Sequence, residues 1–276
     1  MSFSTGIGFR RDLAEALSSY EGELLQFIEL APENWAGIGG KWRKVLDRAA
    51  EKYAITSHGL SLSLGSPDPL DFDFLKKVKR FLNDFSVQIY SEHLSFTKCD
   101  NAHVHELLPI PFRVDAALHV AERIRQAQDF LERPIAIENV SYYTPVSPEI
   151  SEAEFITTVL EKADCQLLLD VNNVFVNAFN HKYDAKQFLQ EIPLERVAYI
   201  HMAGHEQRTE DLIIDTHGAP IVDPVFELFR WVSPRIEPVP VLLERDYNIP
   251  NLTELLGELS TIHQINKEAR ELQDAA

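Results

Sequence analysis

The chain has 276 residues, and its 45% hydrophobic and 25% charged residues are typical of a folded globular protein, which excludes a disordered or fibrous chain. Its 26 basic and 43 acidic residues give a formal net charge of −17, which opposes binding to the phosphate backbone of a nucleic acid. Because Cys99 and Cys165 are the only cysteines and form no CxxC pair, a disulfide scaffold or thiolate zinc site is disfavoured and a reducing cytoplasm is expected.

The N-terminal stretch MSFSTGIGFRRDLAEAL lacks the basic region and following apolar stretch of a secretion signal. No run in the sequence approaches the roughly 20 apolar residues of a membrane-spanning helix. We therefore expect a soluble protein that is neither secreted nor inserted in a membrane.

Short apolar or β-branched runs alternate with stretches of helical periodicity, a pattern typical of a parallel sheet with crossover helices. Eight strands are expected, at residues 5–10, 26–32, 54–60, 87–94, 134–140, 166–172, 197–204 and 239–246. Helices are expected between them, for example at residues 41–53, 71–85, 113–132 and 152–163. Because no linker or low-complexity segment interrupts the series, we predict an α/β fold, a single-domain TIM (β/α)8 barrel over residues 1–276 with a C-terminal helix.

Six consecutive expected strands end in an imidazole or a carboxylate. These residues are His58, Glu92 with His93, Glu138, Asp170, His201 and Glu244. A barrel brings the carboxyl ends of all its strands to one mouth, so these side chains should converge there. One acid and one base would suffice for proton transfer, whereas imidazoles and carboxylates without thiolates suit iron, manganese or zinc. A carboxylate on a central strand, with Glu138 as the best candidate, could bridge two ions.

More potential ligands lie in the segments that follow these strands, which we expect to be loops. They are Asn172, Asn173 and Asn177 after the sixth strand, His205 after the seventh, and Asp215 with His217 in the segment IDTHG. Alternate residues of an extended backbone point to the same side, so Asp215 and His217 could clamp a third ion. His205 follows His201 by four residues, but Gly204 between them disfavours a helix that would carry both on one face.

The histidines and carboxylates at the strand ends could instead have purely structural roles. An isolated histidine or glutamate near a strand end is more often a hydrogen-bonded structural residue, and charged residues can simply mark where strands leave the core. The placement of all six positions at one rim, rather than any single residue, favours a metal site.

The ordered segments SHGLSLSLGS, YSEHLSF, IENVSYY, LLDVNNVFVNAFNH, YIHMAGH, IDTHG and LLERDYNIP resemble the successive motifs of the DUF692 or UPF0276 family. Members of this family are also called multinuclear non-heme iron-dependent oxidative enzymes, and they include the methanobactin biosynthesis subunit that oxidises cysteine. The resemblance runs from Gly6 nearly to Asn251.

The resemblance implies two or three iron ions with mixed Fe(II)/Fe(III) valence and O2 as co-substrate. By motif, one ion would be held by His58, His93 and Glu138, and its neighbour by Glu138, Asp170, His201 and Glu244. A third would be held by Asp215, His217 and either Asn172 or Asn173, of which we favour Asn173.

The resemblance also implies a substrate and a partner. The substrate would be a cysteine in a ribosomally made precursor peptide, delivered by a separate recognition protein. Glu92 and His205 are candidates for orienting ligands or transferring protons because they stand close to ligands in the sequence. Arg245 could neutralise a substrate carboxylate or form a salt bridge within the barrel.

Two other functions remain to be distinguished. One is a different metal-dependent TIM barrel, either a sugar isomerase of the xylose isomerase type or a hydrolase of the endonuclease IV type, although the −17 charge argues against a DNA substrate. The other is a binding scaffold with a structural metal, but such a site would close with about four ligands rather than gather this many.

Overall fold

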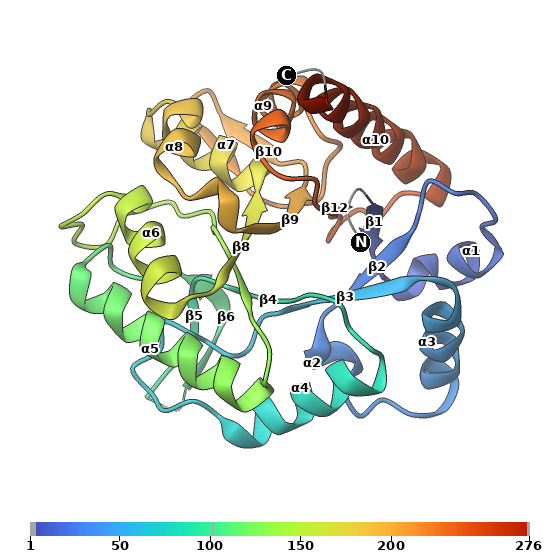
Figure 1. Cartoon of the computed structure of the whole chain (residues 1–276), viewed down its shortest axis with the longest axis horizontal. Coiled ribbons are helices and arrows are strands. Elements are labelled where there is room, and N and C mark those ends of the chain that lie inside the picture. The colour runs from blue at the N-terminus through green and yellow to red at the C-terminus, as the bar shows by residue number, and fades with distance from the viewer. Residues whose placement is uncertain (1–3, 101, 275–276) are drawn as a thin grey trace.

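The computed structural model describes residues 4–100 and 102–274, and at its centre eight parallel strands close into a barrel (Figure 1). The strands follow one another around the barrel as β1, β2, β3, β4, β7, β8, β9 and β12. Their bounds are Thr5–Gly8, Phe27–Leu30, Ala54–Gly59, Tyr90–His93, Ala136–Glu138, Gln166–Asp170, Val197–Met202 and Val241–Leu243 in the same order. Each of the eight expected strands is present, which confirms the predicted TIM barrel.

Helices surround the barrel (Figure 1). The four named in the sequence analysis are α3 (Gly40–Lys52), α4 (Phe72–Asp84), α5 (Val114–Leu131) and α6 (Glu152–Ala163). The others are α1 (Ala14–Ser19), α2 (Pro32–Trp35), α7 (Val171–His181), α8 (Ala185–Glu191), α9 (Asp223–Val232) and α10 (Leu252–Asp274), and short 3-10 turns cover Arg11–Leu13, Leu194–Arg196 and Ser233–Arg235. Among the helices of the described residues, none has the length and apolar character that crossing a membrane requires.

The segment after β8 is helical, where a loop was expected. The carboxylate of Asp170 accepts a hydrogen bond from the backbone N–H of Asn173 at 2.6 Å, so Asp170 caps the N-terminus of α7. The strand expected over residues 166–172 therefore ends at Asp170, and Asn172, Asn173 and Asn177 all stand on α7. The cap thus brings one face of a helix directly to the end of a barrel strand.

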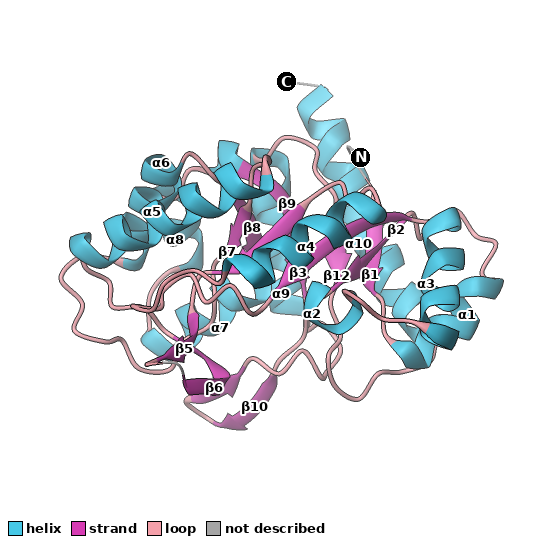
Figure 2. Cartoon of the chain, turned by 90° about the horizontal axis from the view of Figure 1, so that it is seen from below, coloured by secondary structure: helices cyan, strands magenta, loops and turns pink. Residues whose placement is uncertain are grey.

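Two antiparallel hairpins, which the sequence analysis did not predict, follow β4 and β9 on the carboxyl-terminal side of the barrel. The first joins β5 (Phe96–Cys99) to β6 (Ala102–Leu108), and the second joins β10 (Glu206–Thr209) to β11 (Leu212–Ile214). Figure 2 shows β5, β6 and β10 together on the same side of the barrel. The hairpins therefore extend the walls of the mouth.

The strand pleat places an apolar layer beneath the predicted ligands. Ala136, Leu168 and Tyr199 form a small buried cluster apart from the main core, which lies between the barrel and its helices. Side chains two residues apart on a strand point to the same side. Each residue of this layer is therefore followed, two positions later, by a predicted ligand: Glu138, Asp170 and His201.

Candidate metal centre

The first cluster joins β3, β4 and β7. His58 Nε2 and His93 Nε2 lie 3.0 Å and 3.2 Å from Glu138 Oε2, and they lie 3.2 Å from each other. His93 Nδ1 lies 2.8 Å from the carbonyl oxygen of Gly59. Because a carbonyl only accepts, His93 carries its proton on Nδ1 and directs the Nε2 lone pair toward Glu138.

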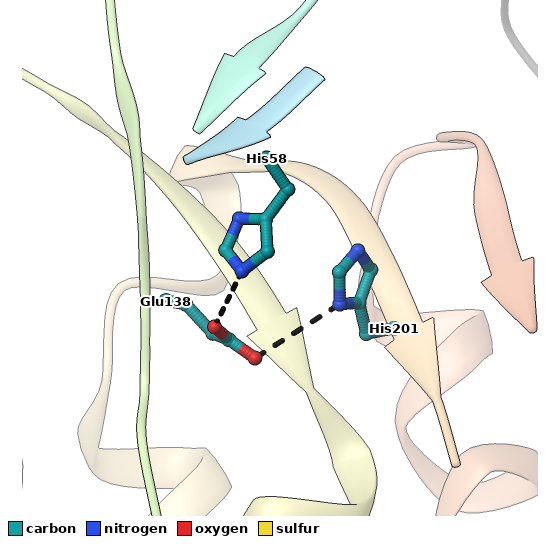
Figure 3. A group of neighbouring side chains, drawn as sticks. All are labelled: His58, Glu138 and His201. Atoms are coloured by element: carbon teal, nitrogen blue, oxygen red, sulfur yellow. Dashed lines mark ion pairs between the residues drawn. The ribbon is translucent and has the colours of Figure 1, made fainter. Parts of the chain in front are cut away.

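A second cluster shares Glu138 with the first (Figure 3). Glu138 Oε1 lies 3.9 Å from His201 Nδ1, and this nitrogen lies 3.0 Å from Glu244 Oε2. One ligand atom from each of Glu138, Asp170, His201 and Glu244 lies within 4.8 Å of all the others, and all four residues are buried. Glu138 therefore presents one oxygen to each cluster, the arrangement expected of a bridging carboxylate.

Glu29 on β2 belongs to this centre, although the sequence analysis did not select it. Its Oε1 lies 3.0 Å from His201 Nε2, and its Oε2 accepts a hydrogen bond from Thr56 Oγ1 at 3.2 Å. This contact leaves His201 Nδ1 facing Glu138 and Glu244. A glutamate inside the apolar run FIEL was the available signal, because a charged side chain is rarely buried without a partner.

A third group forms around His217 at the rim. His217 Nε2 lies 2.7 Å from Asp215 Oδ1 and 3.9 Å from Asp170 Oδ2, while Nδ1 lies 3.1 Å from Glu244 Oε2 and 3.5 Å from Asp246 Oδ2. The backbone of His217 is left-handed (φ +48°), so the extended geometry expected for this pair is wrong even though the side chains meet. Asp246 was not predicted, but it stands two residues after Glu244.

These clusters contain buried polar atoms whose hydrogen bonding is incomplete. Six of them make no hydrogen bond of good geometry within the described residues: Glu138 Oε2, Asp170 Oδ2, Asn173 Oδ1, His201 Nδ1, His201 Nε2 and His217 Nε2. The two His201 nitrogens, Glu138 Oε2 and His217 Nε2 nevertheless face an imidazole or carboxylate at 2.7–3.2 Å, which is a crowding of ligand atoms rather than a set of paired ones. Leaving such an atom unpaired costs about 1–3 kcal/mol, so this many in one place requires an explanation. A divalent cation would accept lone pairs from carboxylate, amide and imidazole donors together, and a donor set of nitrogen and oxygen fits iron, manganese or zinc.

Buried charges shift the pKa values of the cluster in opposite directions. Burial disfavours a charge on Glu138, but His93 and His58 lower its pKa to about 2. Burial also disfavours a charge on His58, yet the Glu138 carboxylate raises its pKa to about 9. Burial raises the pKa of Asp170 well above its usual range, and the negative charge of Glu138 adds to this. Without a cation the centre therefore holds protons, and binding of a metal should release them.

The two candidate asparagines, Asn172 and Asn173, differ in their hydrogen bonds. Asn172 already has partners, because its Nδ2 donates to Asp215 Oδ1 at 2.8 Å and its Oδ1 lies 2.8 Å from His205 Nδ1. Asn173 Oδ1, by contrast, is one of the buried atoms without a partner. The geometry therefore favours Asn173 as a ligand. His205 is linked to this third group through Asn172, and its ring stacks on Phe175 with 5.3 Å between the centroids.

Glu92 and Arg245 do not join the clusters, which argues against the roles expected for them near the reacting atoms. Glu92 Oε1 accepts a hydrogen bond from Tyr90 at 2.7 Å, and burial raises its pKa to about 8. Arg245 is buried and donates to Glu258 of α10 at 2.7 Å, the salt bridge that was its alternative role. Alternation along the strand is the reason, since their neighbours His93 and Glu244 point inward.

A cavity of about 380 Å³ opens the clusters to solvent. Tyr143 and Tyr247, both exposed, line it together with loops that follow the barrel strands. The candidate ligands that line it are His93, Glu138, Asn173, Asp215, His217, Glu244 and Asp246. The centre is therefore accessible at one side, as a catalytic metal site requires and a closed structural site does not.

Comparison with known proteins gives relatives along nearly the whole chain. The family model described as RiPP precursor modification enzyme MbnB/TglH/ChrH matches residues 4–267. A UPF0276 protein of Shewanella loihica is 48% identical over 264 residues, covering 96% of this chain and 95% of the relative. A UPF0276 protein of Acinetobacter baylyi is 51% identical over 257 residues, covering 93% and 89%.

Solved structures resemble the chain in fold alone. L-ribulose 3-epimerase has a TM-score of 0.60 at 10% identity, covering 100% of this chain and 98% of that one. D-psicose 3-epimerase has a TM-score of 0.59 at 10% identity, covering 99% and 98%. Function therefore has to be argued from the site.

Proposed function

Because the chain belongs to the MbnB/TglH/ChrH family of RiPP precursor modification enzymes, we propose that it is an iron- and O2-dependent oxidase that modifies cysteine residues of a ribosomally synthesised precursor peptide. The observation that carries the proposal is the set of buried imidazole, carboxylate and amide atoms without hydrogen-bond partners beside an open cavity. Such a site suits a cation that must remain accessible to a substrate.

Two or three iron ions, with mixed Fe(II)/Fe(III) valence, would be held by neighbouring sets of ligands that share Glu138. These sets are His58 with His93 and Glu138; Glu138 with Asp170, His201 and Glu244; and Asn173 with Asp215 and His217, beside which Asp246 lies. When bound, the iron would supply the redox chemistry between O2 and the cysteine thiol. A peptide that loses four electrons and four protons reduces one O2 to two waters, so no further oxidant is needed.

The chain itself would orient the ligands. Asp215 is held from two sides, by Ser141 Oγ at 2.9 Å on Oδ2 and by Asn172 Nδ2 at 2.8 Å on Oδ1. His205 fixes the amide of Asn172 and so acts as a positioning residue rather than touching the ions. Glu29 fixes the ring of His201 in the same way.

As the family resemblance implies, we also propose that a separate recognition protein delivers the peptide to the cavity at the candidate metal centre. A reducing compartment such as the cytoplasm suits a reaction that starts from a free thiol.

Two glutamates offer a matched test of the centre. Glu138→Gln removes the shared ligand, whereas Glu92→Gln changes an equally buried carboxyl outside the clusters. Protein prepared anaerobically with Fe(II) should retain at most half of the wild-type iron in the first variant and all of it in the second. Stoichiometric zinc without iron, and no O2 uptake, would instead favour another metal-dependent TIM barrel.

The reaction is tested by searching the reading frames beside this gene for a short cysteine-containing peptide and co-expressing that peptide with this chain. Co-expression should lower the mass of that peptide, and the change should be lost when its cysteine is replaced by serine or when the oxidase carries Glu138→Gln. An unchanged mass in the presence of iron-loaded protein and O2 would overturn the proposed oxidation.

A further inference from the structure

A second hollow continues the metal cavity away from the barrel axis. It has a volume of about 440 Å³ and is lined by Leu60, Ser61, Thr97, His103, Val104, Glu106 and Leu107. Glu106 and Leu107 also line the metal cavity, so the two hollows meet at these residues. Together they form one trough, which runs from the metal centre between the loop after β3 and the first hairpin.

The loop that forms one wall of the trough is held in place by hydrogen bonds with two side chains, Glu33 and Arg123. Glu33 Oε1 accepts hydrogen bonds from the backbone N–H groups of Leu60 and Ser61, both at 2.8 Å. Arg123, buried on α5, donates to the carbonyl oxygens of Leu64 and Ser63 at 2.8 Å and 3.2 Å. This wall therefore exists before a ligand arrives, which reduces the entropy lost on binding.

The opposite wall is a bulge in β6. The register shifts between Phe96 and Lys98, because Lys98 pairs with His103 and Phe96 pairs with Leu108. Such a shift marks a bulge or irregularity, here beside residues 104–107. Within the described residues β6 has β5 as its one strand neighbour, so its other edge can accept an extended peptide as an added strand.

Apolar side chains project into the outer part of the trough. Leu60 is 44% exposed and Val104 36% exposed, and they line the same hollow from opposite walls. The inner part is acidic and carries the candidate ligands. A cysteine alone would occupy only the inner part, so the outer part fits a residue that neighbours the cysteine in a chain.

We propose that the trough holds an extended segment of the precursor peptide, with an apolar side chain between Leu60 and Val104 and its backbone against residues 104–107. This inference rests on the proposed function, since the occupant is the substrate itself. It goes further by assigning the chain a preference for an apolar residue at a constant spacing from the modified cysteine.

The test uses a displayed library of random 12-residue peptides that share one central cysteine, selected on iron-loaded full-length protein without O2. Enriched sequences should carry an apolar residue at one constant distance from the cysteine. Leu60→Asp and Val104→Asp should weaken binding of an enriched peptide at least tenfold. The controls Leu118→Asp and Val114→Asp alter apolar residues on α5 that are at least as exposed and lie outside the trough, and they should bind as wild type.

The outcomes separate this inference from the oxidation itself. An enriched peptide that needs Leu60 and Val104 but keeps its mass with iron and O2 supports the trough and contradicts the oxidase. Enrichment without an apolar position, or binding that is unaffected by either trough variant, overturns the inference. If a library with serine in place of cysteine gives the same sequences with equal affinity, the trough binds a partner's segment rather than the substrate, which also overturns it.

Discussion

Glu152 provides a quantitative test of the packing behind the metal centre. At the start of α6, its Oε2 accepts hydrogen bonds from the hydroxyls of Tyr142 at 3.1 Å and Tyr183 at 3.2 Å. Its Oε1 accepts from Asn177 Nδ2 at 3.2 Å. Burial raises the pKa of Glu152 to about 7, although these three donors partly oppose the rise. The residue thus joins the loop after β7 to α7, and both carry parts of the centre.

The raised pKa of Glu152 makes the stability of the folded chain depend on pH in a definite direction. In the unfolded chain Glu152 has the ordinary pKa of 4.5. Between about pH 4.5 and 7 the folded chain therefore binds more protons here than the unfolded chain does, so stability falls as pH rises through this window. The difference between 4.5 and about 7 corresponds to at most about 3 kcal/mol, because part of the residue is open to solvent.

Glu152→Gln should remove this pH dependence. Glutamine keeps an oxygen for the two tyrosines but loses the acceptor for Asn177, at a cost of about 1 kcal/mol. At pH 5 the variant should be about as stable as wild type, because wild type has by then lost about 1 kcal/mol, and at pH 8 it should be up to about 2 kcal/mol more stable. Urea unfolding in the presence of a chelator measures both values.

Comparison of variant with wild type isolates Glu152 from the titrating groups of the metal centre, which both proteins share. Glu161→Gln, on the exposed face of the same helix, is the control and should leave the pH slope unchanged. If the difference between Glu152→Gln and wild type stayed constant from pH 5 to pH 8, the carboxyl would not change its protonation as argued, and the reasoning would be refuted.

Three further outcomes follow from the contacts of the centre. Arg245→Met should lower the free energy of unfolding by about 3 kcal/mol, because it leaves a carboxylate of α10 without its cation, yet iron content should stay unchanged; urea unfolding and metal analysis check both. His205→Phe keeps an aromatic ring but removes the hydrogen bond to the amide of Asn172. Fe(II) titration should therefore show that the third ion, beside Asn173, Asp215 and His217, binds at least tenfold more weakly. His181→Phe should have no such effect. Removing the metal with a chelator should lower Tm, since a free ion at about 1,000 times its Kd stabilises a protein by about 4.1 kcal/mol; an equal Tm with and without chelator would contradict a metal in the folded chain.

Much of the fold and of the candidate centre could be predicted from the sequence, because the patterns typical of strands and of helices can both be recognised in it. Apolar runs alternating with helical stretches gave the eight strands of the barrel, and a barrel must bring its strand ends together. The structure accordingly gathers His58, Glu138 and His201 from distant parts of the chain. The second hairpin was missed because its strands have only four and three residues and the whole of β10 is polar, and α7 was missed because its start depends on the Asp170 cap rather than on periodicity.

The sequence by itself determined which residue types stand at each strand end, and hence the prediction of a metal centre of imidazoles and carboxylates. Only the tertiary structure decided which of two neighbouring polar residues faces inward: His93 rather than Glu92, and Glu244 rather than Arg245. A strand alternates its sides, but the sequence does not say which side is the barrel interior when both neighbours are charged or polar. The folded chain makes that choice and gives each outward residue a partner of its own: Tyr90 for Glu92, and Glu258 of α10 for Arg245.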